Sequence, residues 1–451
     1  TAKSASKAGA GKRDTQVSKP ENPDKSEKRV SKSKKNSSQK NVFNNDKKIN
    51  QQSRGASEKG FAINDDDNKP TIKKPKSDKP QRSKISSDKQ NRERVGSLAT
   101  TEITSVKSHL VTGASGYLGT LLVKKLLEKG DAVKAIDISD FPINSILTKE
   151  ERERFSFYKG DAANYAVMLD LSKGVDTLYH LVAQVPLRRP SREFKIANED
   201  TPKIAAKAAA YNKVRKMVLI SSSAVYGLPR FSPLDEETQP LPFEPYGASK
   251  LKGEENAKKF LANTETELVI IRPRTIISAH RLGIFDTLFN FISENRNLYL
   301  IGRSNHPLQF IHANDLINAI VLLAEKGSGT YAVGTDKYAT LESDLRELIS
   351  YANSASKIKH LPKALTIHIL AILYKLRLSP LSPWHYKGYA NRFDVTTERA
   401  SALGWRPEYS NLDMLKEAYD SYLEDKDKSE LNSIHSKALK QGIIKIIRKL
   451  S

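Results

Sequence analysis

Three glycines in the stretch TGASGYLG, residues 112–119, constrain the fold of this chain more than any other feature. They follow the apolar run HLVTGA (109–114) and precede YLGTLLVKKLLEKG (117–130), in which leucines recur at helical spacing. Gly113, Gly116 and Gly119 allow a tight turn, a close approach of the backbone to a pyrophosphate and close packing of helix on strand. The free N–H groups at the start of the helix can then bind the phosphates. The stretch therefore predicts a dinucleotide-binding site.

Strand-like and helix-like segments alternate from about residue 107 onward. The strand candidates are 109–114, 131–138, 155–161, 176–183, 216–224 and 267–277, with helical patterns notably at 191–212, 245–264 and 283–296. Apolar strands separated by helices indicate a parallel sheet covered on both faces. We therefore predict an α/β fold, with a Rossmann-type doubly wound parallel sheet over about 107–280. A smaller mixed α/β substrate lobe is expected mostly over 281–425, with its apolar helix at 364–376 buried.

Acidic and small residues end the next three strand candidates. Asp137 ends the second, 24 residues after Gly113, where a carboxylate can bind the ribose hydroxyls and repel a 2′-phosphate. Ile138 follows it instead of an arginine, so we expect NAD as the cofactor and not NADP. Asp161 ends the third candidate, where its carboxylate can reach the adenine edge. Ala183 ends the fourth, where a small side chain lets the backbone lie against the cofactor.

A tyrosine and a lysine stand four residues apart in PYGASK (245–250), which places Tyr246 and Lys250 on one helical face. SSSAVYG (221–227) follows the fifth strand candidate, where its serines point into the crevice in which doubly wound sheets bind ligands. A phenol with its ordinary pKa of about 10 is too weak a base at neutral pH. Lys250 and a positively charged nicotinamide ring are expected to lower that pKa. Tyr246 could then take a proton from a carbinol whose oxygen Ser222 holds.

These residues together resemble the extended short-chain dehydrogenase/reductase family, the NAD-dependent epimerases and dehydratases, over roughly 107–425. TGASGYLG is similar to the family's TGxxGxxG, FIHANDL (310–316) to its FVHVDDL, and RFDVTTERASALGW (392–405) to its C-terminal signature. IRP (271–273) resembles the strand whose backbone touches the nicotinamide. The resemblance implies the catalytic residues Ser222, Tyr246 and Lys250. The cofactor-binding residues that we expect are Gly113, Ser115, Gly116, Tyr117, Leu118, Gly119, Asp137, Asp161, Ala183, Tyr246, Lys250 and Pro273.

The residues after the catalytic serine separate the reactions of the family. Sugar-nucleotide 4,6-dehydratases carry two acids there, and UDP-glucuronate decarboxylases typically carry a glutamate just before V-Y-G. Ser223 and Ala224 offer no carboxylate, so both reactions are disfavoured. Retaining epimerases and plain dehydrogenases need only the triad. We therefore expect an NAD-dependent epimerase or dehydrogenase acting on a carbinol of a nucleotide sugar.

One departure from the family weakens the sugar interpretation. Many nucleotide-sugar epimerases bind the substrate diphosphate with an arginine two residues before the F of the FIH-like motif, where this chain has Leu308-Gln309. Arg274, Arg281 and Arg303 are the alternative cations, and we expect Ser223, Arg274 and Arg303 to bind substrate. A 3β-hydroxysteroid-dehydrogenase-like enzyme for an apolar alcohol, with helix 364–376 as a lid, stays open. So does a non-catalytic NAD-fold scaffold, although an intact triad disfavours it.

Charge is concentrated at the ends of the chain. Residues 1–100 hold 26 Lys and Arg against 12 Asp and Glu with only two aromatic side chains, so we expect 1–106 to be a disordered basic tail. Residues 426–451 include SKALKQGIIKIIRKLS, whose pattern predicts a basic amphipathic helix able to lie on an anionic membrane. Either end could contact an anionic polymer non-specifically, whereas sequence-specific nucleic-acid reading is not expected.

The remaining expectations concern compartment and assembly. The chain has no cysteine, which removes disulfides, thiolate metal sites and cysteine nucleophiles, and we expect no metal. No apolar run approaches the ~20 residues needed to span a bilayer, so we expect a soluble cytoplasmic protein, peripheral to a membrane surface at most. The resemblance implies a homodimer formed through the helices at 191–212 and 245–264.

Overall fold

The structure, a computed structural model, describes residues 106–185, 191–283, 285–376, 378 and 383–427. The predicted basic tail, residues 1–106, therefore lies outside the described residues except at its last position. The predicted amphipathic helix near the C-terminus lies entirely outside them.

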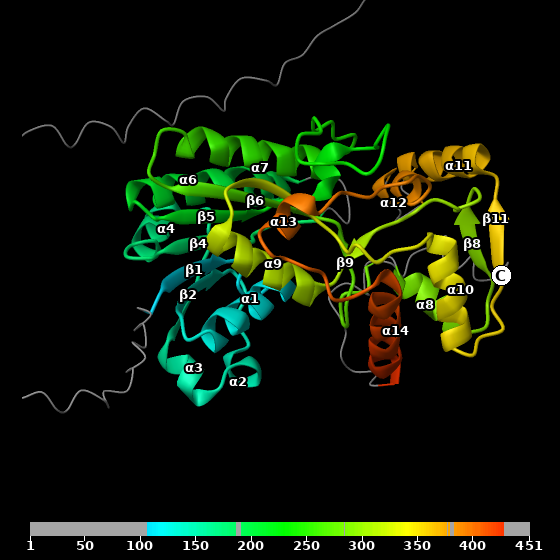
Figure 1. Cartoon of the computed structure of the whole chain (residues 1–451), viewed down its shortest axis with the longest axis horizontal. Helices are drawn as coiled ribbons and strands as arrows, with labels where there is room; N and C mark the ends of the chain where they lie inside the picture. The colour runs from blue at the N-terminus through cyan, green and yellow to red at the C-terminus, as the bar shows by residue number, and fades with distance from the viewer. Residues whose placement is uncertain (1–105, 186–190, 284, 377, 379–382, 428–451) are drawn as a thin grey trace, which may run out of the picture. The chain divides into compact units, whose positions relative to one another are not determined.

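A seven-stranded parallel sheet forms the centre of the N-terminal part, with strand order β10-β6-β5-β4-β1-β2-β3 (Figure 1). This order, with its crossover at β1, confirms the doubly wound α/β fold expected from the sequence. Because all strands run in the same direction, their carboxyl ends meet at one edge of the sheet. The strands are β1 (Ser108–Thr112), β2 (Ala132–Asp137), β3 (Phe155–Lys159), β4 (Thr177–His180), β5 (Lys216–Ile220), β6 (Glu267–Pro273) and β10 (Gly329–Val333).

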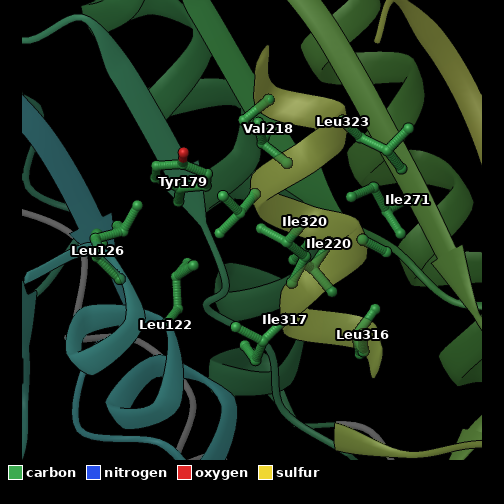
Figure 2. Packing of buried hydrophobic residues seen from close by; sticks show 14 of the residues in the cluster. Leu122, Leu126, Tyr179, Val218, Ile220, Ile271, Leu316, Ile317, Ile320 and Leu323 are labelled. Atoms are coloured by element: carbon green, nitrogen blue, oxygen red, sulfur yellow. The ribbon is translucent and has the colours of Figure 1, made fainter. Parts of the chain in front are cut away.

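Helices cover both faces of the sheet (Figure 1). One face carries α1 (Tyr117–Glu128) and α9 (Ala313–Lys326), and the other carries α4 (Tyr165–Leu171), α6 (Thr201–Tyr211) and α7 (Pro245–Leu261). Figure 2 shows Leu122 and Leu126 of α1 and Ile317 and Ile320 of α9 in one buried apolar cluster with Tyr179 and Val218 of the sheet. Burial of these apolar stripes fixes the strand order and thereby the crevice at the carboxyl edge.

Two elements that we expected in the substrate lobe belong to the sheet layers instead. β10 pairs with β6, with Thr330 opposite Ile270, and α9 packs on the same face as α1. The chain therefore returns to the first layer after it has begun the lobe. No local sequence pattern placed α9 and β10 in the sheet domain, because a helix followed by a short strand fits the sheet domain and the substrate lobe equally well.

The expected elements are shorter than the sequence patterns where polar side chains bond to the backbone. β5 stops at Ile220 and not at 224, because the Ser222 hydroxyl accepts a hydrogen bond from Ala224 N and caps a 3₁₀ turn, η2 (Ser223–Tyr226). The helical pattern at 191–212 resolves into α5 (Arg192–Lys195), a π-helical turn η1 (Ile196–Asp200) and α6. The run 267–277 splits into β6 and a short β7 (Thr275–Ile276) that pairs with β9 (Phe310–Ile311).

The C-terminal lobe has its own apolar core. Phe285, Phe289, Phe310, Leu345 and Tyr419 are buried together there. Its elements are α8 (Phe285–Ser293), β8 (Leu298–Ile301), α10 (Leu341–Tyr351), β11 (Ile358–Leu361), α11 (Lys363–Lys375), α12 (Pro383–Gly388) and α14 (Asn411–Asp427). The short helices α2 (Ile143–Ile146), α3 (Lys149–Glu153) and α13 (Glu398–Ala402) lie against the sheet domain.

The expectation that the apolar helix at 364–376 is buried is wrong. α11 contains no buried residue, and Leu365, Ile369 and Ile372 are each about half exposed or more. The helix rests on β8 and α12 with one face only, so apolar composition was a poor guide to burial here. Within the described ranges, no helix is both long and apolar enough to cross a bilayer.

Candidate active site

The glycine-rich loop between β1 and α1 is closely packed. Gly113 has φ +71°, and a Cβ there would lie 2.9 Å from Val182 N. A Cβ on Gly119 would overlap the carbonyl oxygen of Gly113. The loop can therefore hold this conformation only with glycine at both positions. The loop places the first turn of α1 at the carboxyl edge of the sheet, and the free N–H groups of that turn can bind phosphate oxygens.

Asp137 at the end of β2 closes this loop. Its Oδ2 accepts a hydrogen bond of 3.0 Å from Ser115 N, and its Oδ1 accepts one of 2.9 Å from Ser139 N. The Ser115 hydroxyl donates to the carbonyl of Ser139. The carboxylate expected to bind the ribose is thus fixed beside the phosphate loop, and each oxygen keeps a further lone pair for a ribose hydroxyl.

The other expected cofactor residues lie at the same edge of the sheet. Asp161 follows β3 and is exposed, with Oδ1 accepting a hydrogen bond from Ala163 N at 2.8 Å. Ala183 follows β4 and is exposed, whereas Pro273 ends β6 and is buried. Tyr117 donates from its hydroxyl to the carbonyl of Ala279 at 3.0 Å and so joins the glycine loop to the segment after β7. The edge is therefore lined as a dinucleotide site requires.

The three predicted catalytic residues converge at the end of β5. Glu244 caps α7 by accepting hydrogen bonds from Tyr246 N at 2.8 Å and Gly247 N at 2.6 Å, which sets Tyr246 in the first turn. Lys250 is buried one turn later and donates from Nζ to the carbonyl of Ile220 at 2.7 Å. Ser222 lies two residues beyond Ile220, and its side chain acts to lower the pKa of the Tyr246 phenol.

Small residues between Tyr246 and Lys250 allow this convergence. A Cβ on Gly247 would overlap the carbonyl oxygen of Ala224, so only glycine lets α7 approach the turn after β5. Ser249 is buried and donates to the carbonyl of Tyr246 at 2.8 Å. Packing therefore requires Gly247 and buries Ser249, whereas Ala248 between them is exposed.

Burial dominates the pKa values of the catalytic pair. It raises the pKa of the Tyr246 phenol, while the Ser222 side chain and the charge of Arg281 act in the opposite direction. Burial lowers the pKa of Lys250 to about 8, partly offset by the negative charge of Glu254. We expected Lys250 to lower the pKa of Tyr246, but its ammonium is turned to the Ile220 carbonyl. A base at Tyr246 therefore depends on positive charge from elsewhere, for which Arg281 is one source.

Sequence reasoning missed a buried ion pair between β6 and α7. Arg272 of β6 donates from Nε and Nη2 to the carboxylate of Glu254 at 3.0 and 2.7 Å, and from Nη1 to the Tyr226 hydroxyl at 3.1 Å. The Ser221 hydroxyl donates to the same carboxylate. Glu254 stands four residues after Lys250, on the same face of α7, and this spacing was the available signal.

A second missed network joins β1 and β4. The Thr201 hydroxyl donates to the Ala197 carbonyl at 2.8 Å, so it accepts from His180 Nε2 at 3.0 Å. His180 Nδ1 then accepts from the Thr112 hydroxyl at 2.8 Å. Burial, with a smaller effect of the Lys250 charge, lowers the pKa of His180 to about 3. The neutral imidazole therefore fixes the carboxyl ends of β1 and β4 and takes no proton in catalysis.

The three candidate substrate residues are not grouped together. Arg274 is buried and donates from Nη1 to the Ser223 hydroxyl at 3.1 Å and from Nε to the Gln309 carbonyl at 3.2 Å. Ser223 therefore lies with Arg274, directly after Ser222, the predicted catalytic serine. Arg303 lies exposed in the turn after β8, and no described contact joins it to this site.

Gln309 itself takes a structural role. Its side chain donates to the carbonyls of Thr335 and Val395 and accepts from Val395 N, so it cannot replace a substrate-binding arginine.

Comparison with known proteins identifies the family. Residues 109–334 match the model of the NAD dependent epimerase/dehydratase family. The chain belongs to this family. An uncharacterised protein of Sinorhizobium fredii, y4nG, is 34% identical over 320 residues, which cover 70% of this chain and 79% of that protein. A UDP-glucose 4-epimerase of Mycolicibacterium smegmatis is 25% identical over 313 residues, 66% of this chain and 93% of its own.

Solved structures of the family share the fold. A Bacillus cereus UDP-glucuronic acid 4-epimerase in complex with UDP-glucuronic acid and NAD has a TM-score of 0.57 at 24% identity, covering 70% of this chain and 99% of its own. The enzyme described here is thus an NAD-dependent member of the extended short-chain dehydrogenase/reductase family, and the expected cofactor is confirmed. The glycine cradle and the fixed Asp137 fit NAD at the carboxyl edge.

Proposed function

We propose that this enzyme is an epimerase or dehydrogenase that acts on a carbinol of a nucleotide sugar. In this proposal Tyr246 is the base, Ser222 holds the substrate oxygen, and Lys250 helps to bind the cofactor. The convergence of the three residues at the end of β5 supports the assignment. NAD, when bound, accepts a hydride from the carbinol carbon, which becomes a carbonyl carbon.

The residues of the chain account for the proton. The Tyr246 phenolate takes the proton of the substrate hydroxyl, while the Ser222 hydroxyl donates to the substrate oxygen and keeps it in line. In an epimerase the same phenol returns the proton after the keto sugar has turned its other face. Ser223 and Ala224 carry no carboxylate that could remove a second proton, so water elimination is disfavoured. The glutamate typical of decarboxylases just before V-Y-G is also missing, so decarboxylation is disfavoured as well.

The observation that favours an anionic substrate is the uncompensated charge of Arg274. Among the described residues, no carboxylate lies within ion-pair distance of its guanidinium. Asp394 attracts it from farther away, but Arg392 already holds that carboxylate at 2.8 and 2.9 Å. Burial lowers the pKa of Arg274 to about 10, so it stays charged at neutral pH. A buried charge without a counter-ion lowers the stability of the protein, and an anion bound beside it offsets this loss.

We assign Arg274 and Ser223 to the anionic part of the nucleotide sugar. The Phe393 ring packs against the guanidinium, with its centroid 3.8 Å from Cζ, and fixes the guanidinium plane. Arg274 thus replaces the arginine that this chain lacks at Leu308. An apolar alcohol has no negative charge to pair with the buried guanidinium of Arg274. This disfavours the hydroxysteroid-like alternative.

The proposed homodimer rests on the family resemblance. The alanines at 205, 206, 208 and 209 of α6 are already buried within the chain, against the sheet and α7. A dimer through α6 and α7 would therefore use their outer residues, such as Lys207 and Tyr211, both of which are exposed. Light scattering of wild type and Tyr211→Glu tests this contact, and an unchanged dimer in the variant would exclude it.

The function is tested with the purified full chain. Native mass spectrometry followed by denaturation identifies retained dinucleotide, and incubation with a panel of UDP-sugars identifies the substrate by chromatography of the products. Retained NAD with interconversion of two epimers supports an epimerase, which recycles its cofactor. Net NADH formation supports a dehydrogenase. Turnover of apolar alcohols without turnover of any nucleotide sugar would overturn the proposal.

A further inference from the structure

Helix α11 is apolar on two opposite faces, although it lies at the surface. Ile367, Leu370 and Tyr374 are half-buried against the lobe. On the opposite face, Leu365, Ile369, Ile372 and Leu376 recur at helical spacing and are 60, 47, 58 and 61% exposed. A helix that is hydrophobic all round is normally enclosed by protein or by lipid. One face of α11 therefore lacks the partner that its composition requires.

The segment that carries this face is basic. Residues 348–393 contain seven Lys and Arg and no Asp or Glu. Lys363 and Lys375 are exposed at the two ends of α11, and Lys357 and Lys359 are exposed on and beside β11. The helix and β11 lie together at the outer edge of the lobe (Figure 1). The exposed apolar row is thus flanked by cations, and one carboxylate, that of Glu342 on α10, lies 3.4 Å from His360 of β11.

The length of α11 decides how it can meet a bilayer. Its 13 residues are too few for the ~20 that a membrane span needs. A short surface helix whose exposed apolar face is flanked by cations can lie in the plane of the interface, with apolar side chains roughly 5–10 Å into the headgroup region and cations at the phosphates.

We propose that the exposed face of α11 is a docking surface for an anionic lipid bilayer. The proposal is independent of the chemistry at Tyr246. Its partner is chosen by charge, because a predominantly basic surface attracts anionic headgroups. In a two-fold dimer the same patch would meet itself, and two predominantly basic surfaces would repel each other. A second copy of the chain is therefore the disfavoured occupant.

The absence of cysteine from the chain allows a direct test. Ile372→Cys in the full-length protein is labelled with an environment-sensitive fluorophore and mixed with phosphatidylglycerol vesicles or phosphatidylcholine vesicles. A matched control carries the label at Glu153→Cys, an exposed position on α3, which is well separated from α11 (Figure 1). We expect a blue shift for the label at 372 with the anionic vesicles, and none for the label at 153.

A second variant separates α11 from the basic ends of the chain. Ile369→Ser with Ile372→Ser removes apolar contact while keeping every charge, and we expect about tenfold weaker co-sedimentation with anionic vesicles. Retained NAD binding shows that the variant is folded. An unshifted label at 372 on vesicles that do bind the protein would overturn the proposal. A blue shift that needs no vesicles and grows with protein concentration would overturn it in favour of self-association.

Discussion

The guanidinium of Arg274 donates a hydrogen bond of 3.1 Å to the hydroxyl of Ser223, so a buried cation lies directly beside the residue that follows Ser222, the proposed catalytic serine. This relationship makes Arg274 the best-placed group for an anionic substrate. If Arg274 binds the substrate as proposed, it takes the place of the arginine that this chain lacks before the FIH-like motif.

Replacement of Arg274 tests this assignment. We expect Arg274→Gln to raise KM for a nucleotide sugar about 10- to 100-fold with a smaller change in kcat, because the charge binds substrate and transition state alike. Steady-state kinetics provide the measurement, and Arg303→Gln, at an exposed position, is the matched control. Equal KM values in the two variants would remove Arg274 from the site.

Replacement of the phenol tests the base. Tyr246→Phe removes one oxygen and should lower turnover by at least about 100- to 10,000-fold while NAD stays bound. Released dinucleotide and the rate of product formation are measured on the same preparation. Turnover close to wild type would mean that another group takes the proton.

The pKa of Lys250 gives opposite pH dependences for binding and for stability. As pH rises through about 8 the folded protein loses the ammonium, so NAD affinity should fall. The unfolded chain keeps that proton up to about 10.5, so this group makes the fold more stable between those values as pH rises. Lys250→Gln should abolish both trends, whereas the exposed Lys252→Gln should keep them. Fluorescence titration of NAD and denaturant unfolding across pH 7–10 would show whether the two trends diverge.

The buried pair of Glu254 and Arg272 predicts a large loss of stability. Glu254→Gln leaves Arg272 buried without its counter-charge and should lower the free energy of unfolding by about 3–5 kcal/mol. Glu255→Gln, one residue along the same helix, breaks only an exposed pair with Lys252 and should leave stability essentially unchanged. Urea unfolding of both variants compares a buried with an exposed pair, and similar losses would contradict the argument.

Close packing at Gly119 predicts a loss of cofactor binding. The methyl group of Gly119→Ala would overlap the Gly113 carbonyl oxygen, so the loop must move and NAD affinity should fall about 10- to 100-fold. Gly388→Ala is the control, because its Cβ would meet only Trp384 at an ordinary 3.8 Å. Unchanged NAD affinity in Gly119→Ala would show that the loop tolerates a side chain.

Much of the fold could be predicted because its signals are local. The apolar run ending at Thr112 and the glycines after it define β1, the loop and the start of α1 within a few residues. Strand ends could not be predicted as well, since the end of β5 depends on the hydrogen bond from Ala224 N to the Ser222 side chain. Apolar composition also failed for α11, because burial depends on what covers a helix and not on the helix alone.

The site was predictable only in part, for a similar reason. Ser222, Tyr246 and Lys250 belong to motifs with a fixed spacing. The burial of Arg274 depends on Phe393 and Gln309, which approach from distant parts of the chain. The direction in which the Lys250 ammonium points depends on the end of β5. No pattern within one segment encodes such contacts.

Asp137 has a consequence for any evolutionary or engineered change of cofactor preference. Replacing the acid at the end of β2 is the simplest route from NAD toward its 2′-phosphorylated counterpart. In this chain the same carboxylate also fastens the backbone at Ser115 and Ser139, so a substitution that removes the repulsion also releases the loop. Replacing Asp137 therefore changes cofactor preference and loosens the loop at the same time. A variant that accepts the 2′-phosphorylated cofactor would need new hydrogen-bond acceptors for the backbone amides of Ser115 and Ser139.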